Sequence, residues 1–362
     1  MIIKSLELAD YRNYKELNIN FDRGTTILYG DNAQGKTNIL EAVYMAATTK
    51  SHKGSKDKEI IRFGEEEGHI RTYLEKDGVE TRVDMHLRKA GSKGIAIDGQ
   101  KIKRAADLLG LCNVVFFSPE DLGIIKNGPA ERRRFVDMEL CQLNQIYLND
   151  LNNYNKIVNQ RNKLLKDMYM SPGLKDTLFV WDMQLASYGS KVISARREFV
   201  RQLNDIILEI HKHLSGNREE LVIRYEPDTT EEEFENKLFL NMDRDMKQKM
   251  TSVGPHRDDF IFEINGKDAR KYGSQGQQRT AALSLKLAEI ELVKKIAGDT
   301  PVLLLDDVLS ELDSNRQQLL LSGMGDVQTI ITCTGLEDFV RNRFRINKVY
   351  QVTEGEVREK DE

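Results

Sequence analysis

Apolar and polar residues alternate in two stretches near the start of the chain, and the alternation predicts a pair of half-buried strands. The stretches cover residues 2–8 and 16–21, and a period of two puts every second side chain on one face of a sheet. Residues 25–29 are a short run rich in β-branched side chains, and residues 38–49 carry apolar side chains at helical spacing. Between 60 and 104, Gly-containing turns separate further short strands.

The middle of the chain has the pattern of long helices. Residues 131–166 contain no Gly or Pro, and their apolar side chains recur at helical spacing. The Ser171-Pro172-Gly173 segment interrupts this pattern, which resumes over 176–214. We therefore expect a two-helix hairpin with each arm about 50 Å long. The acidic segment 229–249 predicts one more helix, outside the hairpin.

The last third of the chain returns to shorter elements. Residues 253–273 have a pattern of strands and turns, and 274–297 form a strongly amphipathic helix. Residues 301–307 predict a fully buried strand that ends in two acids, and 329–332 predict a second such strand. The charged tail 354–362 is expected to fray. Buried strands combined with helices predict an α/β fold with an inserted helical-hairpin subdomain.

A phosphate-binding loop lies between the third strand and the first helix. Its residues match the pattern G-x-x-x-x-G-K-[ST] in the strand–loop–helix setting that the pattern requires. Backbone N–H groups of such a loop face the phosphates, Lys36 contacts the β- and γ-phosphates, and the Thr37 hydroxyl coordinates Mg²⁺. The sequence therefore predicts ATP binding by Gly30, Asp31, Asn32, Ala33, Gln34, Gly35, Lys36 and Thr37.

The buried strand that ends in Asp306 and Asp307 supplies the second half of an ATPase site. Asp306 is expected to hold Mg²⁺ together with Thr37, and Asp307 to act as the general base for the attacking water. With Lys36, these two acids are the predicted catalytic residues. Most of the chain separates Lys36 from Asp306. A large segment is therefore inserted between the two halves of one ATPase.

Two further motifs indicate which kind of ATPase this is. Ser274, Gly276 and Gln277 open the amphipathic helix, and Ser310-Glu311-Leu312-Asp313 follows the acids. This arrangement resembles the ATPase head of ABC-type proteins. The resemblance implies that Ser274 and Gly276 of one subunit cap the γ-phosphate held by the other. Gln277 belongs to the same trans-acting signature, and Asp313 contacts across the dimer. The alternative for Ser274 is an ordinary helix N-cap.

Along residues 2 to about 352 the chain resembles the RecF family of bacterial DNA replication and repair proteins. The resemblance rests on residues 8–14, 117–122, 128–135 and 254–259, together with the signature and the block 305–320. There are departures from the family pattern. Asn127 replaces a more usual Gly, Asp307 is shorter than the usual Glu, and Thr332-Cys333-Thr334 replaces the switch histidine of transporters. We expect slow hydrolysis.

The resemblance implies a protein that binds duplex DNA next to single-stranded gaps in an ATP-dependent manner. It implies a weak, DNA-stimulated ATPase that dimerises on ATP, works with RecR and RecO in loading RecA, and is linked to the SOS response. Residues 1–130 and 251–362 would form the two lobes of the head, and 131–250 the hairpin arm. The rival interpretation is an ABC-type head that drives a protein or transporter partner instead of DNA.

Composition sets limits on these functions. The 362 residues are 40% hydrophobic and 31% charged, which is typical of a globular protein, and no apolar run is long enough for a membrane-spanning helix. The three cysteines form no CxxC pair, which favours a reducing cytoplasm, and we expect no disulfide framework and no zinc site. The six histidines are scattered, so we expect no metal-ligand cluster: His52, His69, His86, His211, His213 and His256.

The net charge of −4 means that DNA contact would need local basic patches. Residues 50–58 carry four lysines and one acid, and either contact DNA or form a flexible loop. Residues 132–134 are three arginines, either a solvated helix face or phosphate contacts. Arg12 is either a nucleotide contact or a surface residue. Residues 256–259 could form an ion-paired structural turn.

Overall fold

A computed structural model describes residues 1–168, 177–325, 327–336 and 346–360. The chain divides into two compact units. The first unit combines Met1–Asp121 with Glu289–Glu362, and the second is Leu122–Ala288. None of the described helices is long and apolar enough to cross a membrane. The Ser171-Pro172-Gly173 break expected at the tip of the hairpin lies outside the described residues.

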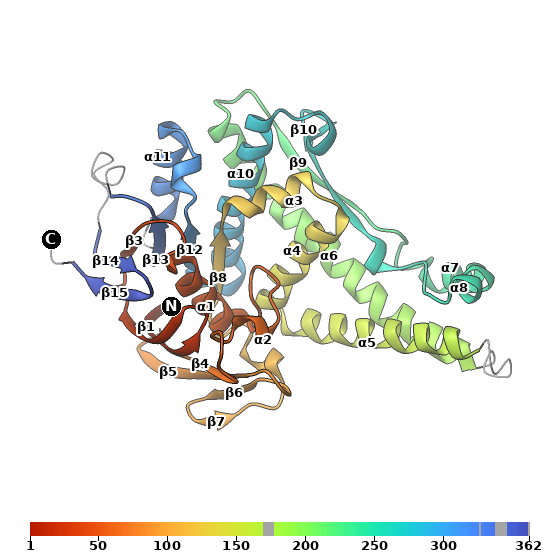
Figure 1. The fold of residues 1–362 in the computed structure, drawn as a ribbon. Helices are drawn as coiled ribbons and strands as arrows, with labels where there is room; N and C mark the ends of the chain where they lie inside the picture. The colour runs from red at the N-terminus through yellow and green to blue at the C-terminus, as the bar shows by residue number, and fades with distance from the viewer. Residues whose placement is uncertain (169–176, 326, 337–345, 361–362) are drawn as a thin grey trace. The chain divides into compact units, whose positions relative to one another are not determined.

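The first unit contains a mostly parallel six-stranded sheet in the order β15-β14-β3-β13-β12-β8. Its strands β12 and β13 consist of buried residues throughout, as the apolar runs predict. The helices of this unit include α1, which follows β3 directly, and α11 (Figure 1). The bounds are β3 Thr25–Tyr29, β8 Val114–Phe117, β12 Val302–Asp306, β13 Thr329–Cys333, β14 Lys348–Thr353, β15 Glu356–Glu359, α1 Lys36–Thr48 and α11 Ser314–Met324.

A second, antiparallel sheet of the same unit has the order β2-β1-β4-β5-β6-β7. Leu6 of β1, Val43 of α1 and Leu304 of β12 belong to one hydrophobic cluster. The core therefore joins both sheets to α1. The bounds are β1 Ile2–Tyr11, β2 Tyr14–Asn20, β4 Glu67–Lys76, β5 Val79–Arg88, β6 Gly94–Ile97, β7 Gln100–Lys101 and, between the sheets in sequence, α2 Asp57–Ile60.

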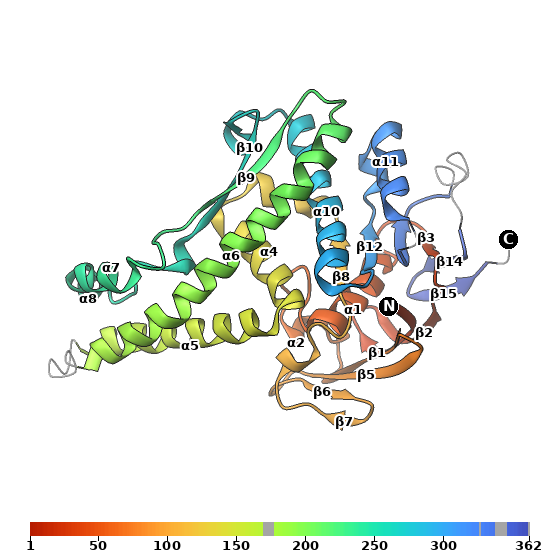
Figure 2. The same cartoon turned by 180° about the vertical axis from the view of Figure 1, so that it is seen from behind.

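The second unit is built around the long helices α5 and α6, which run side by side (Figures 1 and 2). A three-stranded sheet in the order β11-β10-β9 completes it. The bounds are α3 Leu122–Lys126, α4 Pro129–Leu143, α5 Gln145–Asp167, α6 Leu178–Leu214, β9 Leu221–Glu226, α7 Phe234–Leu240, α8 Met242–Gln248, β10 Asp259–Ile264, β11 Lys267–Asp268 and α9 Ala269–Tyr272. Helix α10, Gln275–Ala297, begins in this unit and its last residues, from Glu289 on, belong to the first.

Three expectations about these elements were wrong. The first arm of the hairpin is not one helix, because Asn144 has extended φ and ψ and its side chain caps α5 by accepting from Ile146 N and Tyr147 N. The acidic segment 229–249 forms two short helices, α7 and α8, that meet at Asn241. The tail does not simply fray, because Glu356–Glu359 pairs with β14 as strand β15.

The compact units also divide the chain differently from the expected lobes. Residues 251–288 join the helical unit instead of the C-terminal lobe of the head. The reason is visible in the pairing, because β10 forms a six-residue ladder with β9, the strand that follows α6. Arg132 of α4 and Arg196 of α6 also form ion pairs with Asp259 and Asp258, at the start of β10.

Candidate nucleotide-binding site and signature helix

Two glycines make possible the tight loop between β3 and α1. Gly30 has φ +152° and Gly35 has φ +112°, values that residues with a Cβ rarely adopt. A Cβ at Gly30 would lie 2.2 Å from the carbonyl oxygen of Val352, and one at Gly35 would lie 2.4 Å from Nδ2 of Asn13. The helix α1 begins directly after the loop. A helix N-terminus in this position presents N–H groups and a positive dipole end to an anion.

Lys36 folds its side chain back over this loop. Its ammonium donates to the carbonyl oxygen of Gly30 at 2.5 Å and to that of Asp31 at 2.7 Å, and the residue is only 7% exposed. Burial lowers the pKa of Lys36, while the carboxylates of Asp307 and Asp306 act in the opposite direction. A desolvated cation in a glycine loop interacts strongly with a bound phosphate.

Asp306 joins the phosphate loop to the neighbouring strands. Its Oδ1 accepts one hydrogen bond from the Thr37 hydroxyl and one from the Thr332 hydroxyl, both at 2.8 Å. The parallel pairing of β12 with β13 puts Asp306 opposite Thr332. The structure thus brings Thr37 and Asp306 into direct contact, as the sequence predicts. A hydroxyl and a carboxylate oxygen are ligands that fit Mg²⁺.

Asp307 has a different environment from its neighbour. Its φ is +53°, and its N–H donates to the hydroxyl and carbonyl oxygens of Thr332. This backbone turn holds the side chain in place, and Oδ1 of Asp307 is buried with no hydrogen-bond partner among the described residues. A buried carboxylate oxygen without a donor is costly unless a ligand or water satisfies it. The residue therefore suits a general base and fits a site completed by nucleotide and water.

Arg12 lies in the turn between β1 and β2 and is bound by a buried carboxylate. Its Nη2 and Nε donate to the two oxygens of Glu41 at 2.7 and 2.8 Å. Further hydrogen bonds reach Ser55 Oγ and the carbonyl of Glu59. Arg12 is therefore no solvated surface residue in this structure. It connects α1, which carries Glu41, to the lysine-rich loop 50–58.

Several residues that hold the site were missed in the sequence. Asn13 donates from Nδ2 to the carbonyl of Gln34 and accepts from Asn38, so its side chain ties the β1–β2 turn to the phosphate loop. Thr332 fixes both acids, and Glu41 fixes Arg12. Asn13 lies within the segment 8–14 that carries the family resemblance, and that resemblance was the available signal. Glu41 falls on an otherwise buried helix face, where an acid implies a partner.

The signature residues belong to the second unit, at the start of α10. Ser274 Oγ accepts from the N–H of Gln277 at 3.2 Å, and the Gln277 side chain accepts from the N–H of Ser274 at 2.8 Å. This reciprocal pair is a capping box, so Ser274 is indeed an N-cap. The hydroxyl proton is not used by this contact and can donate to an anion. Gln277 also donates to Glu219 at 2.9 Å, while Ser274 and Gly276 are exposed.

Asp313 caps α11 by accepting from the N–H of Arg316 at 3.0 Å, and its carboxylate pairs with the Arg316 guanidinium at 2.7 Å. Its side chain is 53% exposed. A surface position fits the contact across a dimer that the ABC resemblance implies. The capping contact alone explains the residue equally well.

Of the arginines 132–134, Arg132 is buried and Arg133 half-buried, which corrects the interpretation of these two as a basic patch, while Arg134 is exposed. Arg132 is 3% exposed, and its guanidinium contacts both oxygens of Asp259 and the carbonyl of Asn127. Arg133 donates to the carbonyl of Asp258. These contacts occupy Arg132 and Arg133 within the fold. Arg132 and Arg133 therefore do not form a free surface for phosphates.

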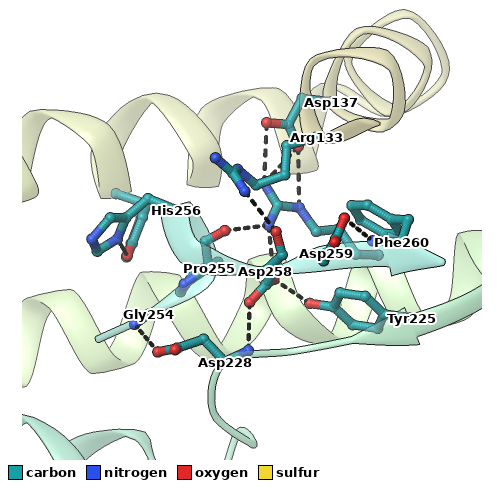
Figure 3. A network of polar contacts seen from close by, with 12 residues as sticks. Arg133, Asp137, Tyr225, Asp228, Gly254, Pro255, His256, Asp258, Asp259 and Phe260 are labelled. Carbon is teal, nitrogen blue, oxygen red and sulfur yellow. Dashed lines mark hydrogen bonds and ion pairs between the residues drawn. The ribbon is translucent and has the colours of Figure 1, made fainter. Parts of the chain in front are cut away.

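The turn that contains His256 and Asp258 is a structural anchor, shown in Figure 3. The Asp258 carboxylate is fully buried and accepts from Arg196 at 2.8 Å, from the Tyr225 hydroxyl at 2.5 Å and from the N–H of Asp228 at 2.9 Å. The ring of His256 contacts the Tyr154 hydroxyl at 2.6 Å and the carbonyl of Thr251 at 3.1 Å. Nε2 must therefore carry the proton, and Nδ1 accepts. The network joins β9, α6 and the start of β10.

Some side chains of the loop 50–58 hold it against the rest of the first unit, while its lysines face solvent. Ser51 donates to Glu41 at 2.5 Å, the ring of His52 stacks on Phe116 with centroids 4.0 Å apart, and Ser55 accepts from Arg12. The lysine side chains of the loop are exposed: Lys50, Lys53, Lys56 and Lys58. The basic character predicted here is therefore held on a fixed loop.

Comparison with known proteins shows one family along nearly the whole chain. The family model described as the RecF/RecN/SMC N terminal domain matches residues 2–358. The protein "DNA replication and repair protein RecF" of Agathobacter rectalis is 63% identical over the whole of both chains. The protein of the same name from Lachnoclostridium phytofermentans is 61% identical over 99% of both.

Solved structures agree with the sequence relatives. A structure described as the recombination mediator protein RecF with ATP in the RecFOR pathway has a TM-score of 0.93 at 36% identity, covering 99% of this chain and 97% of that one. An SMC head bound to a winged-helix domain of ScpA, at 16% identity and TM-score 0.58, shares the fold. The ABC-type ATPase head fold is thereby confirmed, and the chain belongs to the RecF family.

Proposed function

We propose that this protein is an ATP-dependent DNA-binding recombination mediator that acts at single-stranded gaps. The supporting observation is the complete set of Lys36, Thr37, Asp306 and Asp307 in a chain whose relatives are RecF proteins, one of them solved with ATP and described as a recombination mediator. The RecFOR pathway of that description supports partnership with RecR and RecO. Assistance to RecA loading and a link to the SOS response are part of the same proposal.

The chain's own residues have distinct tasks in this mechanism. ATP supplies a γ-phosphoryl group whose hydrolysis resets the protein. Lys36 and the N–H groups of Gly30–Thr37 hold the phosphates, and Thr37 and Asp306 hold Mg²⁺. Asp307 accepts the proton of the attacking water through its unpartnered oxygen. Arg12 is assigned a nucleotide contact in this proposal, and its hydrogen bonds to Glu41 and Ser55 order the loop 50–58.

Dimerisation completes the site in this proposal. The exposed Ser274 and Gly276 at the start of α10 cap the γ-phosphate held by a second copy, and Asp313 contacts across the same dimer. Gln277 positions Ser274 through the capping box and is itself fixed by Glu219. The N-terminus of α10 then adds its dipole to the stabilisation of the phosphate.

DNA contact is assigned to the lysine-bearing loop 50–58. With a net charge of −4, one subunit attracts a phosphate backbone weakly. An ATP-bound dimer doubles the exposed lysines of the loop. Because each phosphate contact adds about 0.9 to the slope of log affinity against log salt, dimerisation should roughly double that slope.

The test is DNA binding at several salt concentrations, with and without ATP, for the wild type and Ser274→Arg. We expect ATP to raise the affinity and the salt slope of the wild type. Ser274→Arg, which obstructs the trans contact, should lose this rise while a single subunit still binds ATP. Equal affinities and slopes for the two proteins would refute the dimer mechanism. Absence of DNA binding by either would favour an ABC-type head with a protein partner.

A further inference from the structure

Three side chains able to bind a metal ion meet on one face of the antiparallel sheet. Glu67 and His69 are two residues apart on β4, so they lie on the same face. The register between β4 and β5 places His86 directly opposite His69. None of the three takes part in the nucleotide site. The scattered histidines of the sequence are thus partly brought together by the fold.

The geometry of this group is close to that of a metal site. The His69 and His86 rings stack with centroids 4.3 Å apart and 21° between their planes. Nε2 of His86 lies 2.7 Å from Oε2 of Glu67. Each residue offers one ligand atom, and these three atoms all lie within 4.8 Å of one another. Among the described residues, this is the group of three His, Cys, Asp or Glu side chains that comes so close together.

The neighbouring strands leave room above the two rings. Across the sheet, Ala9 of β1 pairs with His69, and Gly94 of β6 pairs with His86. Across the four strands, the two histidines are therefore flanked by small residues on both sides. All four residues line an open hollow of about 940 Å³. An ion and its water can enter there without displacing a bulky side chain.

We propose that Glu67, His69 and His86 form a binding site for a borderline divalent transition-metal ion, with Zn²⁺ as the expected occupant. Two imidazoles and one carboxylate are ligands that Zn²⁺ accepts, and three protein ligands leave a fourth position for water. Metal–ligand bonds of about 2.0–2.1 Å put tetrahedral ligand atoms about 3.4 Å apart. Rotation of these partly exposed side chains brings the ligand atoms from within 4.8 Å of one another to that separation. The ion links β4 to β5.

Arg88 competes with the ion for His86 and Glu67. Its Nη2 donates to Nδ1 of His86 at 3.1 Å, and its Nε lies 3.6 Å from Glu67. Without metal, Nε2 of His86 therefore carries the proton and donates to Glu67. When the ion binds Nε2, the proton of the neutral ring moves to Nδ1, which can no longer accept from Arg88. Removing the guanidinium should therefore strengthen metal binding.

The experiment is titration of the nucleotide-free, chelator-treated full-length protein with Co²⁺ as a spectroscopic probe, repeated calorimetrically with Zn²⁺. The wild type should take up one equivalent, and Zn²⁺ should raise its melting temperature, because a ligand that binds only the folded state stabilises it. His69→Ala and His86→Ala should each weaken uptake at least tenfold. Arg88→Met should strengthen it severalfold.

His213→Ala provides the matched control, because His213 is an exposed histidine of the second unit and its loss should leave uptake unchanged. Circular dichroism of His69→Ala checks that the variant folds, and Glu67→Gln tests the carboxylate while keeping its shape. Absence of saturable uptake by the wild type would overturn the proposal. Uptake by His69→Ala equal to that of the wild type would overturn it as well.

Discussion

Asp306 and Asp307 are neighbours in sequence and have opposite surroundings. Asp306 accepts from two hydroxyl groups, whereas one oxygen of Asp307 is buried without a donor in the described part of the chain. The backbone of Asp307 is left-handed, and β12 ends at Asp306. Oδ1 of Asp306 is fixed by two protein hydroxyls, whereas Oδ1 of Asp307 is left for a ligand. This difference supports separate roles in metal binding and proton transfer.

We predict that Asp307→Asn separates binding from hydrolysis. The amide keeps the shape of the side chain and cannot accept a proton, so ATP turnover should fall by about 10²–10⁴-fold while nucleotide affinity changes little. The comparison is Lys36→Ala, which removes the cation of the phosphate loop and should abolish productive ATP binding. Measured affinities and single-turnover rates distinguish the two. An equal loss of ATP binding in both variants would show that Asp307 is structural.

Glu41 supports a second prediction at this scale. Burial tends to raise the pKa of Glu41, but hydrogen bonds from Arg12 and Ser51 outweigh it, and the pKa lies below the ordinary value of 4.5. A lowered carboxyl pKa in the folded state adds stability that is present above the ordinary pKa and is lost as the pH falls through the folded one. Glu41→Gln should therefore destabilise the protein by roughly 2 kcal/mol at pH 7.

Thermal or urea unfolding at pH 7 and at pH values below 4.5 checks this prediction. The difference in unfolding free energy between the wild type and Glu41→Gln should narrow as the pH falls through the lowered pKa of Glu41. The wild-type carboxyl then becomes neutral, like the amide of the variant. Glu16→Gln, at an exposed position of β2, is the control and should stay within about 0.5 kcal/mol of the wild type at both pH values. A gap that is independent of pH would contradict the charged pair with Arg12.

At the scale of elements, the sequence could predict what short-range patterns determine. Strand β3 and helix α1 on either side of the phosphate loop, helix α10 and the buried strands β12 and β13 follow from the pattern of apolar residues. The break at Asn144 could not be predicted in this way. An Asn within a helical pattern marks a cap only where its side chain accepts hydrogen bonds from nearby backbone N–H groups, and the pattern of apolar residues does not reveal this. The pair His69 and His86 was also missed, because it depends on the register between two strands.

The assignment of residues 251–288 to the helical unit depends on long-range ion pairs, and these can be tested. Asp258→Asn leaves the buried Arg196 without one of its carboxylates and should destabilise the protein by about 3–5 kcal/mol. Glu263→Gln, on the strand β10 that follows Asp258, breaks an exposed pair with Arg224 and should cost at most about 1 kcal/mol. Thermal unfolding of both variants decides. Similar melting temperatures would show that the Asp258 network is no anchor.

At the scale of the whole molecule, the motifs of one ATPase are divided between two compact units. Lys36, Asp306 and Asp307 belong to the first, and Ser274 and Gly276 to the second. An exposed signature at the N-terminus of a long helix has no predicted task within a single subunit. A second copy that brings this signature to the nucleotide gives it one. ATP-dependent dimerisation is therefore the central claim of the proposed function.

The most direct test of that claim is the mass of the protein in solution, measured by light scattering with and without ATP and Mg²⁺. Asp307→Asn should convert to a dimer when ATP is added and remain one, because it binds the nucleotide and hydrolyses it slowly. Lys36→Ala should stay monomeric because it does not hold ATP, and Ser274→Arg because it cannot complete the partner's site. If all three variants have the same mass with ATP, the trans-acting site does not exist.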